Sequence, residues 1–174
     1  MVSKKTNERE LQDSEWDEEE EDSMKGRYLA FRVHEEDYGI EIQYVTEIVG
    51  IQKIAAVPDM PDFIKGVINL RGQVIPVMDI RTRFRMPPKE YNERTCVIVV
   101  NYDDNPIGLV VDSVNEVTSI PESSVCEPPR VAHSESARYV RGIGKVGDEV
   151  RIILDVSKLL YGTETEAVAQ LLTA

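Results

Sequence analysis

The sequence contains few of the side chains on which most enzyme chemistry depends. Its 174 residues include only two cysteines and two histidines. Cys96 and Cys126 match no metal-ligand spacing, and Cys96 begins the apolar run CVIVV, so we expect it to be a small buried residue. His34 and His133 occur in polar, turn-like surroundings, without a partner at the spacing of a catalytic pair or a metal site. We therefore do not expect an enzyme, a metal or a cofactor.

Long apolar runs and an excess of positive charge are also missing. No uninterrupted apolar stretch approaches the roughly 18 residues of a membrane helix, and the charged N-terminus does not have the pattern of a signal peptide. The chain carries 32 acidic against 20 basic residues, a net charge of −12, which would repel a phosphate backbone. We expect a cytoplasmic protein that neither inserts into membranes nor binds nucleic acid.

The two ends of the chain differ from its middle. Residues 1–25 contain the run DEEEED and few apolar residues, so we expect a disordered acidic tail. Trp16 is the only aromatic residue in this tail, and it is either a solvated side chain or a short anchor for a partner. At the other end, Thr163 and Glu166 have the spacing of a capping box, which predicts a short C-terminal helix or a frayed tail over 163–174.

Between these ends, apolar residues recur with the period of β-strands. YLAFRV at 28–33 alternates as a half-buried strand does. IEIQYVTEIVGIQKI at 40–54 begins as a strand, but its valines then take helical spacing, which predicts one or two helical turns there and in the similar segment 110–117. Asp79 and Asp155 are expected to cap two short helices.

Residues 66–80, GVINLRGQVIPVMDI, predict a hairpin with an unusual tip. We expect Arg71 and Gly72 to form a type I turn followed by a bulge. Pro76 cannot donate to a ladder, so we expect it at a sheet edge or a bulge. A hairpin tip prefers Asn, Asp or Gly, so an arginine there suggests a partner contact or an ion pair that fixes a surface.

The first half of the pattern is repeated in the second half. RTCVIVVNYDDNPIGLVVDSVNEV follows the earlier strands with Gly39 over Gly108, an offset of 69. YVRGIGKVGDEVRIILDV follows FIKGVINLRGQVIPVMDI with Gly66 over Gly142, an offset of 76. A duplicated unit of about 70 residues with roughly five strands has the size of a small barrel, so we predict an all-β double barrel with short connecting helices.

Two further motifs have to be weighed. Residues 142–147, GIGKVG, match a dinucleotide-binding pattern, but a strand-like DEVRIIL follows where a helix is required, so no nucleotide site is expected. Arg81, Arg83, Arg85 and Lys89 form a local basic cluster, which is either the solvated face of a helix or a contact patch for an acidic partner.

The hairpin sequence FIKGVINLRGQVIPVMDI closely resembles the signature hairpin of the CheW family, the adaptors of bacterial chemotaxis. The resemblance extends over residues 26–162 through the segments YLAFRV, YGIEIQYVTEIV, CVIVVNYDDNPIGLVVDSVNEV and YVRGIGKVGDEVRIILDV. It implies two packed five-stranded SH3-like β-barrels, with 26–90 as the first repeat and 91–162 as the second, either separate or intertwined. The long acidic tail departs from the family pattern.

The resemblance also implies a function without catalysis. Such a protein couples methyl-accepting chemoreceptors to the histidine kinase CheA and is recruited through these partners to receptor arrays at the membrane. The cytoplasmic helical tip of a receptor docks between the barrels, and the regulatory domain of the kinase meets the barrel ends. Two alternatives remain: a scaffold for another receptor–kinase system, such as one controlling pilus motility, and a ligand-binding or enzymatic barrel using the cleft between the units.

We expect Arg71 to pair with Glu47, placed on the helical segment of the same repeat, and to hold a receptor-facing surface in shape. The second repeat keeps Glu116 but has Gly147 in place of the arginine, so the two barrels should differ. The alternative for Arg71 is a solvated turn residue that contributes little.

Four more residues complete the predicted partner-binding site. Val45 and Ile48 are proposed as apolar contributors to the receptor groove, or else as ordinary core. Lys65 and Gly66 adjoin the same hairpin and are grouped with it.

Overall fold

The computed structural model of the chain describes residues 24–128 and 138–160. The expected acidic tail before Met24 and the expected helix over 163–174 therefore lie outside the described residues, as do Trp16 and His133. In chain order the elements are β1 (Arg27–Val33), β2 (Glu36–Glu41), η1 (Ile42–Tyr44), β3 (Val45–Gly50), β4 (Ile64–Leu70), β5 (Gln73–Asp79), α2 (Ile80–Arg83), β6 (Cys96–Tyr102), β7 (Asn105–Val111), β8 (Ser113–Ser119), η2 (Glu122–Ser124), β9 (Val125–Cys126), β10 (Val140–Val146), β11 (Glu149–Leu154) and α3 (Val156–Leu160).

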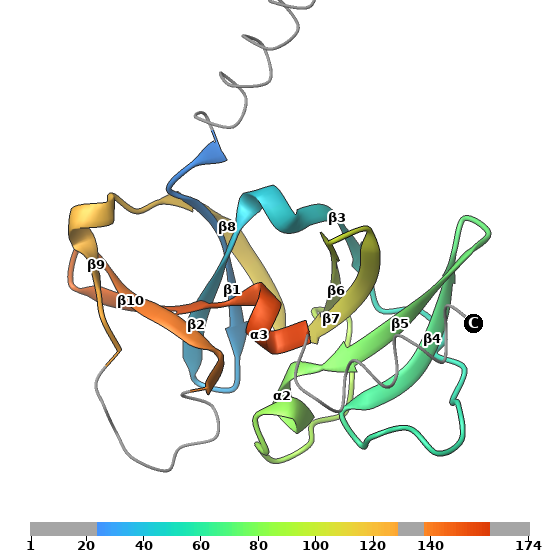
Figure 1. Cartoon of the computed structure of the whole chain (residues 1–174). Coiled ribbons are helices and arrows are strands. Elements are labelled where there is room, and N and C mark those ends of the chain that lie inside the picture. The colour runs from blue at the N-terminus through green and yellow to red at the C-terminus, as the bar shows by residue number, and fades with distance from the viewer. Residues whose placement is uncertain (1–23, 129–137, 161–174) are drawn as a thin grey trace, which may run out of the picture.

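The strands form two curled sheets that lie side by side, so the predicted all-β class is confirmed (Figure 1). One sheet has six strands in the order β8-β1-β2-β11-β10-β9, and the other has five in the order β3-β6-β7-β5-β4. Each sheet combines strands from both halves of the sequence. The first half contributes β1 and β2 to one sheet and β3, β4 and β5 to the other.

The duplication seen in the sequence is repeated in the elements. At the offset of 69, β1, β2 and β3 become β6, β7 and β8, and at the offset of 76, β4, β5 and α2 become β10, β11 and α3. The exchange of strands is symmetric as well, because β3 pairs with β6 while β8 pairs with β1. In addition, the last strand of each repeat pairs in parallel with the second strand of the other repeat: β5 pairs with β7, and β11 pairs with β2.

Three apolar clusters explain why several strands have apolar residues on both faces. The largest cluster lies between the sheets and takes Leu29, Phe31 and Val33 from β1. A second cluster fills the interior of the five-stranded sheet, and a smaller third one fills the interior of the six-stranded sheet. The run CVIVV alternates between the first two clusters, as expected for a strand buried on both faces. Cys96 itself is half-buried rather than buried, because it begins the strand.

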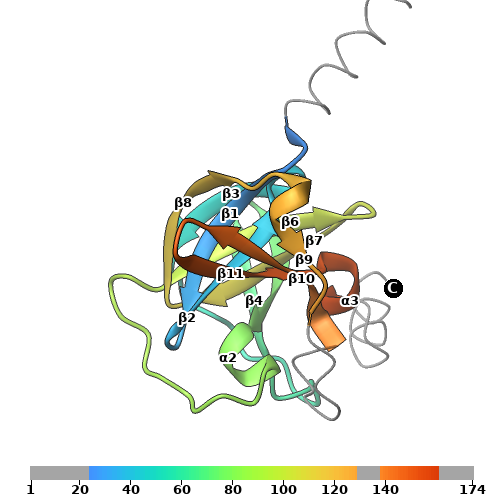
Figure 2. The same cartoon turned by 90° about the vertical axis from the view of Figure 1, so that its left-hand side faces the viewer.

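Helices α2 and α3 pack against the shared core, with α2 at the bottom and α3 at the right of the view in Figure 2. Asp79 accepts a hydrogen bond from the Thr82 backbone N–H at 3.4 Å, and Asp155 accepts one from the Lys158 N–H at 3.1 Å, so both predicted N-caps are confirmed. Phe84, directly after α2, lies between Tyr38 and Tyr139, with ring centroids 5.7 Å away on each side. Aromatic contacts of this kind tie the two sheets together.

Two local predictions need correction. The helical turn expected within residues 40–54 is present as η1, but its counterpart within 110–117 is not helical: this segment forms the end of β7 and most of β8. Pro76 lies inside β5, which pairs on both sides, rather than at an edge. It is tolerated there because the opposite residue, Val67, directs its N–H and C=O to Ala55, and the ladder with β7 begins only at Val77.

Candidate functional site

The tip of the β4–β5 hairpin is tighter than the sequence indicated. Leu70 pairs with Gln73, so Arg71 and Gly72 alone form the loop, with φ angles of 52° and 85°. Two positive φ values identify a type I′ turn, so the predicted type I turn with a bulge is wrong. The side chain of Asn69 supports the loop by accepting a hydrogen bond from the Gly72 N–H at 2.9 Å. Arg71 therefore holds a left-handed conformation that glycine or asparagine adopts at lower cost.

Arg71 forms the ion pair that was predicted from its chemistry. Its Nη2 donates to Oε2 of Glu47. Glu47 lies on strand β3, not on a helical segment as expected, and β3 and β4 are opposite edges of the five-stranded sheet. The pair thus links the tip of the hairpin to the far edge of the curled sheet. The arginine side chain is 73% exposed and the glutamate 28%, so both stay accessible to a partner.

The other four predicted residues differ in their surroundings. Val45 is half-buried and packs against the shared core, whereas Ile48 on the same strand is 43% exposed. Lys65 is the extra residue of a bulge in β4 and is half-buried. Gly66 follows it with a φ angle of 145°, and a Cβ atom there would overlap the carbonyl oxygen of Ala55. Gly66 is therefore required by the close approach of the backbone, while Ile48 is available for contact.

Exposed apolar side chains recur at equivalent places in the two repeats. Ile48 corresponds to Val117, which is 45% exposed, at the offset of 69. Val74, 61% exposed, corresponds to Val150, 53% exposed, at the offset of 76. The ion pair is not repeated, because Gly147 takes the place of Arg71 with a similar φ of 61°. The two sheets therefore present related but unequal surfaces, which we call the Arg71 surface (Glu47, Ile48, Arg71, Val74) and the Val117 surface (Val117, Val150).

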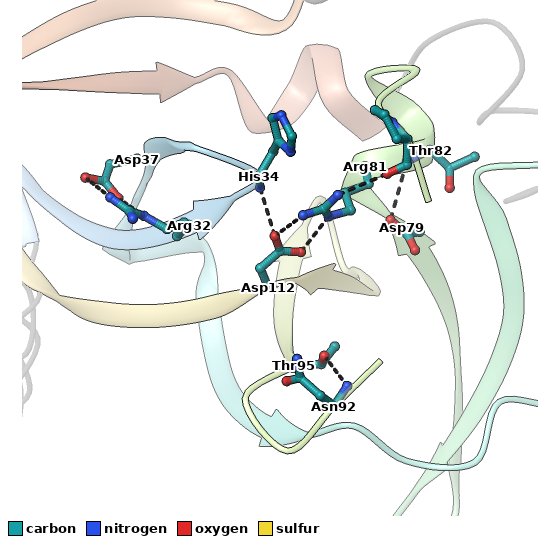
Figure 3. Close-up of polar contacts among 10 residues, drawn as sticks. Arg32, His34, Asp37, Asp79, Arg81, Thr82, Asn92, Thr95 and Asp112 are labelled. Atoms are coloured by element: carbon teal, nitrogen blue, oxygen red, sulfur yellow. Dashed lines mark hydrogen bonds and ion pairs between the residues drawn. The ribbon is translucent and has the colours of Figure 1, made fainter. Parts of the chain in front are cut away.

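The basic cluster after β5 divides into two buried arginines, Arg81 and Arg83, and two exposed residues, Arg85 and Lys89. Arg81 is buried, and its Nε and Nη2 donate to the carboxylate of Asp112 at 2.8 and 2.5 Å (Figure 3). Arg83 is also buried, with its guanidinium 4.1 Å from the ring centre of Phe63 and 4.7 Å from that of Tyr139. Both arginines hold the junction of the two sheets, so both readings offered for them were wrong.

Asp112 joins three parts of the molecule. Besides Arg81, it accepts the backbone N–H of His34, from the β1–β2 turn, at 2.8 Å (Figure 3). Burial alone would raise the pKa of Asp112, but the hydrogen bonds from Arg81 and from His34 outweigh it and hold the pKa below its ordinary value. Asp112 therefore stays ionised and fixes the six-stranded sheet to α2.

No metal-binding arrangement is present in the described part of the chain. No group of three or more histidine, cysteine or acidic side chains in it is placed to hold a metal ion. The glycines of GIGKVG lie in the β10–β11 hairpin, without the helix that a dinucleotide site needs. None of the helices described could cross a membrane.

Comparison with known proteins identifies the family. The family model of the CheW-like domain matches residues 27–164. The chain belongs to the CheW family. It is 38% identical to the chemotaxis protein CheW of Klebsiella aerogenes over 137 residues, covering 79% of this chain and 82% of that protein.

Two further matches extend this result. The crystal structure of the scaffolding protein TtCheW from Thermoanaerobacter tengcongensis matches with a TM-score of 0.73 and 35% identity, covering 80% of this chain and 94% of that one. Protein FrzA of Myxococcus xanthus is 28% identical over 145 residues, covering 82% of this chain and 90% of that protein. CheW proteins are scaffold or adaptor proteins.

Some contacts that shape the CheW fold here left no usable signal in the sequence. Tyr91, in the linker between the repeats, donates its hydroxyl to Oδ2 of Asp79 at 2.6 Å. Burial and this bond raise the pKa of Tyr91, so the phenol stays neutral. The pairing of Arg81 with Asp112 likewise spans 31 positions, just beyond the ladder of β5 with β7.

Proposed function

We propose that the protein is a non-catalytic chemotaxis adaptor that links methyl-accepting chemoreceptors to the regulatory domain of the histidine kinase CheA. The Arg71 surface receives the helical tip of the receptor, and the Val117 surface receives the kinase. Through these two contacts the protein is recruited to receptor arrays at the membrane. Membership of a family of scaffold proteins supports the general role, and the surface chemistry supports the particular one.

The observation that carries the proposal is the exposed ion pair between Arg71 and Glu47. Arg71 keeps a backbone conformation that costs about 1 kcal/mol for a residue with a Cβ, yet its surface ion pair returns little more than that at most. The second repeat has glycine at the equivalent place. An arginine retained against its backbone preference is therefore explained better by a partner than by stability.

Exposed apolar residues next to Glu47 and near Arg71 in the chain are available to a helical partner. Ile48 follows Glu47 on β3, and Val74 lies three positions after Arg71 on β5. Exposed apolar side chains with one charged anchor are the usual way to seat an amphipathic helix. The equivalent exposed residues Val117 and Val150 offer a second surface, which has the exposed Glu116 and Glu149 beside them but no counterpart of Arg71, as an adaptor with two different partners requires.

The direct test is a reconstitution with three components. Membranes containing a chemoreceptor, the kinase and this protein are mixed, and the kinase that sediments with the membranes is measured with and without the protein. We expect kinase in the pellet only when the protein is present. Kinase that sediments equally without it, or that never sediments with it, contradicts the adaptor role.

A second candidate function is the same adaptor role in another receptor–kinase system, favoured by the match to FrzA over 82% of the chain. It predicts that the protein bridges the receptor and kinase of that system in the same assay, and not those of a chemotaxis system.

A further inference from the structure

Glu116 has the same place in the six-stranded sheet that Glu47 has in the five-stranded one. Apart from β9, the two sheets have the same order of strands at the repeat offsets, since β8-β1-β2-β11-β10 matches β3-β6-β7-β5-β4. The ladder of β3 with β6 shifts register just before Glu47, and the ladder of β8 with β1 shifts at the equivalent place. The backbone around Glu116 therefore follows the same course as the backbone around Glu47.

In the first repeat, the glutamate at this place is neutralised by another part of the same chain. Arg71, at the tip of the β4–β5 hairpin, donates from Nη2 to Oε2 of Glu47. A guanidinium matches a carboxylate in shape as well as in charge. The first repeat thus shows which chemical group fits beside a glutamate at this bulge.

The tip of the equivalent β10–β11 hairpin has no cation to offer. Gly147 and Asp148 form its two-residue loop. Gly147 has no side chain, and Asp148 adds a negative charge. Glu116 is exposed, and it forms no ion pair within residues 24–128 and 138–160, which the structure describes. Glu116 and Asp148 are therefore two negative charges at places where the first repeat has one charge, a negative one, on the strand and a positive one beside it on the tip.

We propose that the partner of the Val117 surface supplies the missing cation: an arginine of the partner takes the place that Arg71 has in the first repeat and pairs with the carboxylate of Glu116. This inference rests on the proposed function, in which the Val117 surface receives the regulatory domain of the kinase. Val117 directly follows Glu116 on β8 and is 45% exposed, so an apolar contact adjoins the ion pair. The apolar contact contributes affinity, and the arginine fixes the orientation of the partner.

The placement of a single arginine then separates the two partners. At the Arg71 surface the cation is already present, so a second arginine brought by a partner would meet a like charge. At the Val117 surface the carboxylates are left for the partner to neutralise. An attraction at one surface and a repulsion at the other is an effective way to discriminate between partners. The β4–β5 and β10–β11 hairpins lie at opposite sides of the molecule, so one contact does not block the other (Figure 1).

The test copies the tip of the first hairpin onto the second. Gly147→Arg/Asp148→Gly gives the second loop the residues Arg-Gly of the first, so that Glu116 is paired within the chain. There is room for this change, because a Cβ atom at Gly147 meets no atom within 4 Å. Gly147→Asn/Asp148→Gly is the matched control, since Asn-Gly also suits a type I′ turn but brings no charge. Glu116→Gln removes the charge alone, and Glu47→Gln makes the same change on the other surface.

Binding of the regulatory domain of a CheA kinase to the full chain is measured by calorimetry at low and at physiological ionic strength. We expect Glu116→Gln and the Arg-Gly loop each to weaken binding at least about tenfold at low ionic strength, with a smaller loss when salt is added. The Asn-Gly loop and Glu47→Gln should bind as the parent does. Glu116→Arg should abolish binding, and an arginine-to-glutamate change at one exposed arginine of the kinase domain should restore it.

The outcomes separate this proposal from the proposed function. Binding that is indifferent to Glu116→Gln and to the Arg-Gly loop overturns the proposal and leaves the adaptor role intact. Equal losses in the Arg-Gly and Asn-Gly loops also overturn it, because the shape of the loop is then the cause. Failure of every exposed arginine of the kinase domain to restore binding to Glu116→Arg does the same. A kinase domain that does not bind the parent chain at all overturns the proposal together with the proposed function.

Discussion

Replacing Arg71 by glycine should separate the function of the hairpin from its stability. Glycine is what the second repeat has at this place, where Gly147 holds a φ of 61° against 52° for Arg71. The variant therefore gives the first hairpin the tip residue of the second. It removes the guanidinium while keeping a residue that suits the turn.

The expected change in stability is small because three contributions nearly cancel. Loss of the ion pair with Glu47 costs about 0.5 kcal/mol, since Arg71 is 73% exposed. Relief of the left-handed backbone gains about 1 kcal/mol, and the greater freedom of glycine in the unfolded chain costs about 0.7 kcal/mol. The free energy of unfolding should stay within about 1 kcal/mol of the original, a shift of at most about 4 °C in Tm for a chain of this size.

Arg71→Ala is the matched control, since it also loses the guanidinium but keeps the backbone strain. It should be less stable than Arg71→Gly by about 0.3 kcal/mol, which is the relief of backbone strain less the cost of the freedom of glycine. Both variants should bind a receptor tip fragment at least tenfold more weakly in a titration followed by calorimetry, a loss of about 1.4 kcal/mol. Full receptor binding by Arg71→Gly would refute the assigned role. A loss of more than about 2 kcal/mol in its stability, well beyond what an ordinary surface substitution costs, would show instead that the arginine serves the fold.

Three further predictions concern the frame that holds this surface. Arg81→Met should lower the free energy of unfolding at neutral pH by about 2 kcal/mol in urea titrations, because it leaves the half-buried Asp112 carboxylate without its ion pair. A loss too small to measure would contradict this. The free energy of unfolding of the parent protein should fall as the pH drops below about 4, because the pKa of Asp112 is lowered in the folded state and the unfolded chain then binds more protons. The difference in the free energy of unfolding between the parent and Arg81→Met should therefore shrink over the same pH range. Parallel curves of stability against pH for the two proteins would show that Asp112 is not the cause. Gly66→Ala should destabilise the protein by about 3 kcal/mol in thermal unfolding, because the new Cβ would overlap the Ala55 carbonyl and the residue holds a positive φ. In the control Gly72→Ala the new Cβ meets no atom within 4 Å, so this variant should cost only about 1 kcal/mol. Equal losses in the two variants would refute the steric cause.

Features that depend on neighbouring residues could be predicted from the sequence. The N-caps at Asp79 and Asp155 follow from the residue that precedes each short helix, and the hairpin follows from the strand pattern around Arg71 and Gly72. The duplication, at offsets of 69 and 76, is reproduced by the bounds of the strands. These features are local, or repeat a local pattern, so periodicity and turn chemistry are sufficient to find them.

Features that depend on the packing of distant segments could not be predicted in the same way. Arg81 and Arg83 read as surface residues because α2 is short and basic, but α2 lies where the two sheets meet and both side chains are buried. Glu47 was paired with the right arginine and placed on the wrong element, since alternation on β3 is interrupted by a bulge next to η1. Periodicity cannot show that each sheet takes strands from both repeats. A strand has the same apolar pattern whether it pairs within its own repeat or with the other one.

The most direct test of the two-surface account is an NMR titration of the labelled full chain. A receptor's helical tip fragment and the regulatory domain of a CheA kinase are added in separate experiments, and the amide shifts are mapped onto the two sheets. The account predicts that the receptor fragment shifts the amides of Glu47, Ile48 and Arg71, and that the kinase domain shifts those around Val117 and Val150 instead. Shifts from both ligands on one and the same surface, or none from either well above micromolar concentration, would contradict it.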